Sequence, residues 1–162
     1  VQFEIVVPLY SELMAKGAGA NIKGILGSTN WSWTLQDEGT KAFVKSFGTK
    51  YGFPPSNAAQ TCYAQTILYA DAAARAGSFN PCAVAEALEG FEFDGLGNGP
   101  TLYRAEDHQC FKDVLVMKGK ENPTNEYDLL EVVEVTPRAQ VEYAVDHPMF
   151  AGGDLGTCNP GA

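Results

Sequence analysis

The sequence is short of basic residues and has no apolar run long enough to cross a membrane. It holds 11 Lys and Arg against 20 Asp and Glu, a formal net charge of −9 at pH 7. A chain of this charge repels phosphate backbones, so no nucleic-acid partner is expected. We expect neither a membrane-spanning helix, which needs about 20 apolar residues, nor an intact signal peptide. A cleaved leader or a missing N-terminal portion fits the sequence equally.

The cysteines form no metal or redox motif. Cys62, Cys82, Cys110 and Cys158 include no CxxC pair, which argues against a structural zinc site and a thioredoxin-like centre. An even count fits two disulfides in an oxidising compartment, and free buried thiols fit equally well.

Patterns typical of catalysis and of phosphate binding are also absent. The glycine-rich segment 94–100 lacks both the GxGxxG spacing and a GK[ST] ending, so it predicts a tight turn with positive φ angles. Asp107 precedes His108, but adjacent residues of an extended chain point to opposite faces, which favours a hydrogen-bonded turn over a catalytic pair. We therefore expect no enzyme, no cofactor and no metal.

What the sequence does contain indicates one folded α/β domain. Its 162 residues are 45% hydrophobic and 19% charged, enough apolar surface to offset the entropy of ordering the backbone. Short strands are predicted at 2–7, 22–26 and 101–104. Residues 113–117 and 127–135 predict an antiparallel hairpin with a long loop.

Two helices dominate the middle of the chain. Ser56 or Asn57 begins a long alanine-rich helix that ends at Gly77, and Asn80-Pro81 begins a second helix that runs to about Glu89. The long helix has so little bulk that it can pack closely against a sheet. Its 3.6-residue period is carried by Tyr63, Ile67, Ala70 and Ala74.

Two tryptophans lie in a segment without helical or strand period. Trp31 and Trp33 could line a ligand cleft, since flat rings give large contact area, or could pack at a junction between layers. Asn30-Trp31-Ser32 matches a glycosylation sequon, a pattern short enough to arise by chance.

In this order the chain resembles the C-terminal part of the type I periplasmic solute-binding proteins, the group of the leucine/isoleucine/valine-binding proteins of ABC importers. The resemblance is carried by KYGFPPSNAAQTCYAQTILYADAAARAG (50–77) and AVAEALEGFEFDGLGNGPTLYRAEDHQ (83–109). It implies a partial type I fold of Rossmann-like three-layer α/β/α lobes, each a parallel sandwich, joined by hinge crossings. Residues 1–27 would end the C-terminal lobe and 28–34 would form a hinge crossing. Residues 35–105 would complete the N-terminal lobe, and 106–162 would cross back and add a tail.

The resemblance also implies a ligand site between the lobes. Strand ends and hinge loops make Leu9, Tyr10, Trp31 and Trp33 the candidate ligand contacts, with Glu12 a conceivable ammonium-binding residue or a helix-dipole partner. The ligand would be an amino acid, an amide or an aromatic acid.

Under the same resemblance, Cys110 and Cys158 belong to one lobe, so a 110–158 bridge is expected. The opening units of the family would precede Val1. Their absence would leave sheet edges and an apolar face uncovered. We therefore expect this chain to associate with an N-terminal portion of the same protein or with a second copy.

Three functions remain open from the sequence. The first is a periplasmic, exported solute-binding component that delivers its ligand to an ABC transporter permease. The second is a ligand-sensing module of the same fold in a regulator or receptor. The third is a secreted hydrolase or redox enzyme, which the lack of a catalytic residue set disfavours.

Overall fold

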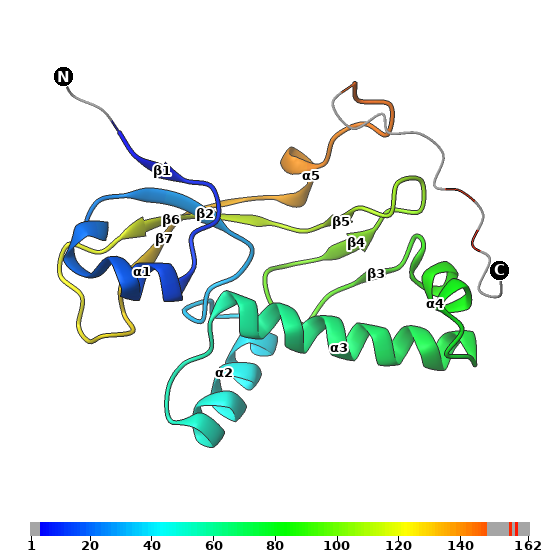
Figure 1. The fold of residues 1–162 in the computed structure, drawn as a ribbon, viewed down its shortest axis with the longest axis horizontal. Coiled ribbons are helices and arrows are strands. Elements are labelled where there is room, and N and C mark those ends of the chain that lie inside the picture. Colours follow the sequence, from blue (N-terminus) through cyan, green and yellow to red (C-terminus); the bar gives the residue numbers. More distant parts are fainter. Residues whose placement is uncertain (1–3, 149–155, 157, 159–162) are drawn as a thin grey trace.

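A computed structural model describes residues 4–148, 156 and 158. These residues form two β-sheets and several helices (Figure 1). The four-stranded sheet has the order β1-β2-β6-β7, formed by Val6–Val7, Leu26–Thr29, Val114–Gly119 and Leu130–Thr136. The three-stranded sheet has the order β3-β4-β5, formed by Glu92–Phe93, Thr101–Tyr103 and Cys110–Phe111. Among these residues, no helix is long and apolar enough to cross a membrane.

The four-stranded sheet joins segments far apart in the sequence. Strands β1 and β2 are parallel and connected through α1 (Glu12–Ala18) and the 3-10 helix η1 (Gly19–Ile22). Strands β6 and β7 form the predicted antiparallel hairpin, and β6 also pairs antiparallel with β2. The expected parallel sandwich is therefore mixed, because β6 enters the sheet from the end at which β2 leaves it. Its core consists of Tyr10, Ala15, Ile22, Leu115, Met117 and Leu130.

Three capped helices follow β2, and Figure 1 shows the longest, α3, beside the three-stranded sheet. They are α2 (Glu38–Tyr51), α3 (Asn57–Ala76) and α4 (Pro81–Leu88), and a short α5 (Arg138–Val141) follows β7. The Ser56 hydroxyl accepts a hydrogen bond from Ala59 N, and the Asn80 side chain caps α4. Gly77 ends α3 with φ at 60°, so the predicted start and stop of α3 and the predicted start of α4 are confirmed.

The face by which α3 packs differs from the predicted one. Its buried residues include Gln60, Ala64, Leu68 and Ala72, whereas Tyr63 and Ile67 are 40% and 38% exposed. Both sets have helical spacing. The buried set faces β4, where Tyr103 donates to Gln65, and the end of β2, where Asn30 donates to Thr61. A helix that has apolar residues at helical spacing on two faces does not reveal by periodicity which face is buried.

The disulfide also differs from the expectation. Cys158 pairs with Cys82 at the start of α4, with the two Cα atoms 5.5 Å apart, and Cys62 and Cys110 are free thiols. The expected 110–158 bridge is therefore wrong. The Cys158 sulfur can form one disulfide and its partner is Cys82, so Cys110 in β5 keeps a free thiol.

Candidate functional site

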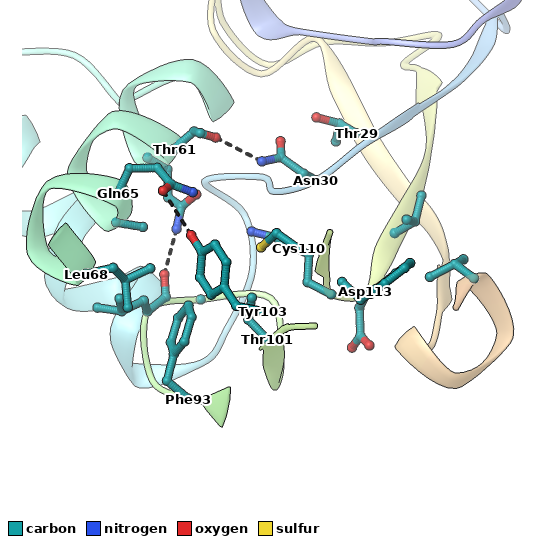
Figure 2. A pocket seen from close by; sticks show the side chains of 18 of the residues that line it. Thr29, Asn30, Thr61, Gln65, Leu68, Phe93, Thr101, Tyr103, Cys110 and Asp113 are labelled. Carbon is teal, nitrogen blue, oxygen red and sulfur yellow. Dashed lines mark hydrogen bonds between the residues drawn. The ribbon is translucent and has the colours of Figure 1, made fainter. Parts of the chain in front are cut away.

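A cavity of about 480 Å³, here called the polar cavity, lies where the ends of β1 and β2 meet α3 and the three-stranded sheet (Figure 2). Its walls come from residues 8–9, 28–30, 60–68, 93–103 and 110–114, together with Val141. The two β-sheets and the longest helix therefore all contribute to one site.

One wall joins the end of β2 to the first turns of α3. Asn30 Nδ2 donates to Thr61 Oγ1 at 2.9 Å, a bond visible in Figure 2. Asn57 Nδ2 donates to Thr29 Oγ1 at 3.1 Å. These bonds hold an amide and two hydroxyl groups along this side of the cavity, with no ionised side chain among them.

The same first turns of α3 carry an acceptor that no described residue satisfies. Gln60 Nε2 donates to the carbonyl of Leu96 at 2.7 Å, which fixes the orientation of the amide, and the buried Gln60 Oε1 has no protein partner. The Tyr103 hydroxyl donates to Gln65 Oε1 at 2.9 Å, and burial raises the pKa of Tyr103. Because a buried, unsatisfied acceptor is costly, Gln60 Oε1 favours a ligand that presents an N–H or O–H group.

The glycine-rich turn connects the segment after β2 to the segment before β6 through Asn98. As predicted, it holds positive φ angles, 94° at Gly97 and 65° at the buried Asn98. The Asn98 amide donates to the carbonyl of Asn30 and, at 2.7 Å, to the carbonyl of Asp113. Asp113 Oδ1 accepts from Arg138 N at 2.7 Å, so the segments before α2, before β6 and after β7 are fastened together.

Two titratable groups that line the polar cavity, on Lys112 and Cys110, are partly desolvated. Desolvation lowers the pKa of Lys112 and raises the pKa of the Cys110 thiol. A raised thiol pKa is the opposite of what an activated nucleophile needs. No group of three His, Cys, Asp or Glu residues in the described part of the chain could hold a metal ion. With Leu68 and Phe93 as apolar walls, the cavity suits a small amphipathic molecule.

The four predicted contact residues are not brought together. Leu9 lines the polar cavity, and Trp33 lines a different cavity. Tyr10 is buried against Gly27, where a Cβ atom would lie 2.8 Å from the Tyr10 Cβ. Trp31 is fully buried, donates from Nε1 to Thr40 Oγ1 at 2.9 Å and packs edge-on against Phe43. Tyr10 and Trp31 are therefore packing residues in this structure.

Glu12 connects α1 to the N-terminus of α3. Its Oε2 accepts from the backbone N–H of Asn57 at 3.0 Å, at the N-terminus of α3 rather than of its own helix. Burial raises the pKa of the Glu12 carboxyl. It therefore serves a helix N-terminus, one of the two predicted roles, but across the fold.

Sequence reasoning missed the polar residues of α3. Asn57, Gln60 and Thr61 lie on its buried face, as does the cavity-lining Ala64. The sequence did contain a signal for them, because these polar residues share a helix face with alanines. Polar side chains on a buried face require hydrogen-bond partners, so this face indicates a polar site.

The two β-sheets and α3 thus surround a cavity of solute size in an α/β fold. A family model described as Periplasmic binding protein matches residues 1–124. The chain belongs to the periplasmic binding protein family, which confirms the resemblance and the type I fold expected from the sequence. Among curated proteins, no sequence relative matches.

Solved structures show the same fold. An amino acid ABC transporter substrate-binding protein from Pseudomonas fluorescens Pf-5 is 24% identical with a TM-score of 0.72, over 83% of this chain and 37% of its own. A branched-chain amino acid ABC transporter periplasmic ligand-binding protein from Burkholderia xenovorans LB400 is 25% identical with a TM-score of 0.71, over 82% and 36%.

A third match is a solute-binding protein of an ABC transporter from Rhodopseudomonas palustris BisB5, in complex with 3,4-dihydroxybenzoic acid. It is 15% identical with a TM-score of 0.71, over 83% of this chain and 37% of its own. The chain thus spans little more than a third of the length of these proteins.

Proposed function

We propose that this chain is the C-terminal, ligand-binding part of an exported periplasmic protein that captures a small solute for an ABC importer and hands it to the membrane permease. The observation that carries the proposal is the polar cavity, at which the chain crossings and α3 meet. Its volume of about 480 Å³ lies within the usual range for ligand pockets, roughly 300–1,000 Å³. Membership of the periplasmic binding protein family supports the same role.

The lining favours a solute with a nitrogen donor and an apolar part, such as an amino acid or an amide. Gln60 Oε1 offers an acceptor to an ammonium or amide N–H group, and Leu68 and Phe93 offer apolar surface. An aromatic acid is the next class, since the protein from Rhodopseudomonas palustris BisB5 binds 3,4-dihydroxybenzoic acid. The proposal is binding without catalysis, because the cavity thiol, Cys110, has a raised rather than a lowered pKa.

Titration calorimetry and thermal unfolding of the 162-residue chain test this proposal, with leucine, isobutyramide and 3,4-dihydroxybenzoate as probes. A ligand at 100 times its Kd adds about 2.7 kcal/mol to the unfolding free energy. We expect leucine or the amide to produce such a shift. A panel in which none of the three raises the unfolding temperature would contradict the proposal.

A pair of substitutions locates the site. Gln60→Met removes the amide at similar size, and we expect it to weaken binding by about tenfold or more, the effect of losing a hydrogen bond to a charged donor. Gln140→Met makes the same change on the exposed surface of α5 and should leave binding unchanged. Equal affinities for the two variants would place the ligand elsewhere.

A further inference from the structure

A second cavity, of about 360 Å³, is built from aromatic side chains and shares no lining residue with the polar cavity. Its rings come from four separate places in the chain: Trp33 after β2, Phe47 in α2, Phe53 between α2 and α3, and Tyr127 between β6 and β7. We call it the aromatic cavity.

The rings of the aromatic cavity also pack against one another. Phe53 and Tyr127 are nearly parallel, with an interplanar angle of 16° and centroids 6.2 Å apart. Phe47 meets Phe53 edge-on at 77°. Pro54 and the fully buried Pro55 follow Phe53 and restrict the backbone from which its ring projects.

The charge around the aromatic cavity is acidic apart from one lysine. Glu12 and Glu126 both line it, and Lys16 is the basic residue among its lining side chains. Lys16 Nζ lies 4.6 Å from the centroid of the Tyr127 ring and 2.7 Å from Glu126 Oε2. A cation of this chain thus already occupies an aromatic face beside a carboxylate.

That internal cation is weakly held. The side chains of Lys16 and Glu126 are 49% and 63% exposed, and ion pairs at such exposure contribute little to stability. The four-carbon stem of lysine also lets its ammonium swing into solvent at little cost. A ligand cation can therefore take the position of the Lys16 ammonium.

We propose that the aromatic cavity is a second ligand site, which takes a small organic cation of the quaternary ammonium class and releases the Lys16 ammonium. Cations bind to the faces of Trp, Tyr and Phe through the ring quadrupole, and several rings around one cavity form the cage that recognises quaternary ammonium groups. The carboxylates of Glu12 and Glu126 also attract a cation, as does the net charge of −9 of the whole chain. Because the two cavities share no lining residue, this cation does not compete for space with the solute in the polar cavity.

Choline and 3,3-dimethylbutan-1-ol separate charge from shape, because the alcohol has the same branched outline without the charge. Titration calorimetry of the 162-residue chain should show choline binding at least about tenfold tighter than the alcohol, since cation–π attraction at a partly desolvated site reaches this size. Equal affinity, or choline that fails to bind at millimolar concentration, would overturn the proposal.

Three variants identify the cavity and its lysine. Lys16→Met should tighten choline binding severalfold because the competing ammonium is gone, and weaker binding would contradict the displacement. Phe53→Ala should weaken binding at least fivefold. Phe79→Ala, an aromatic that is 79% exposed and lines neither cavity, should have no effect.

Glu126→Gln covers the case in which Phe53→Ala does not fold. The carboxylate is exposed, so its isosteric replacement leaves the fold intact, and choline affinity should fall severalfold. An unchanged affinity in Glu126→Gln, together with no gain in Lys16→Met, would show that charge at this rim does not select the ligand.

Discussion

Asn98 is the side chain on which the junction between the two sheets depends. It is 5% exposed, adopts a φ of 65° and donates to the backbone carbonyls of Asn30, after β2, and Asp113, before β6. Asparagine tolerates the left-handed region better than other residues with side chains, so one residue meets both the backbone and the hydrogen-bonding requirement. Replacing it separates the two roles.

Asn98→Gly should lower the free energy of unfolding by about 1–3 kcal/mol. Glycine keeps the positive φ without strain but leaves two partly buried carbonyls without this donor. Asn98→Asp should cost more, because its carboxylate oxygens would face the same carbonyl oxygens. Urea denaturation of the original chain and the two variants measures the effect. If the Asn98→Gly variant is as stable as the original chain, the hydrogen bonds from the Asn98 side chain do not contribute to stability.

Single residues of the site were only partly predictable. The positive φ angles of 94–100 followed from composition, but the target of the Asn98 amide is 68 positions away in sequence, and no local pattern encodes it. Trp31 was predicted as either a ligand contact or a packing residue. Its burial depends on Thr40 and Phe43, which α2 brings to it, so only the fold resolves the choice.

At the scale of elements, the local sequence predicted where helices begin and end better than it predicted which segments they contact. Ser56, Gly77 and Asn80 began and ended helices where the sequence predicted, because a cap is satisfied within a few residues of itself. The second strand was displaced from 22–26 to Leu26–Thr29, since 19–22 forms a 3-10 helix instead. The buried face of α3 and the partner of Cys158 depend on distant segments, and both differed from expectation.

The disulfide between Cys82 and Cys158 can be tested by substitution. Cys158→Ser should lower the unfolding free energy by about 4 kcal/mol, because the 82–158 bridge closes a loop with a sequence separation of 76. Cys62→Ser, at an exposed free thiol, should change stability by less than about 0.5 kcal/mol. Peptide mapping without reductant should recover a fragment that joins Cys82 to Cys158, and a fragment that joins Cys110 to Cys158 would contradict the structure.

At the scale of the whole molecule, several large apolar side chains are exposed to solvent. Leu13 and Met14 of α1, Val6 of β1, and Tyr63 and Ile67 of α3 are all exposed. Strands β1 and β7 are the edges of the four-stranded sheet. We propose that these exposed apolar faces and open strand edges associate with another chain, either an N-terminal portion of the same protein or a second copy.

Association predicts that the size and the folding of this chain depend on its concentration. Sedimentation and circular dichroism over a dilution series should show a larger species at micromolar concentration, with loss of helical signal at nanomolar concentration, because burial of these faces contributes to stability only in the associated state. Ile67→Glu should shift that transition to higher concentration by placing a charge on the α3 face. Thr49→Glu, on the exposed surface of α2, adds the same charge and should leave the transition in place. A monomer that stays fully folded at nanomolar concentration would show instead that these faces are tolerated in water.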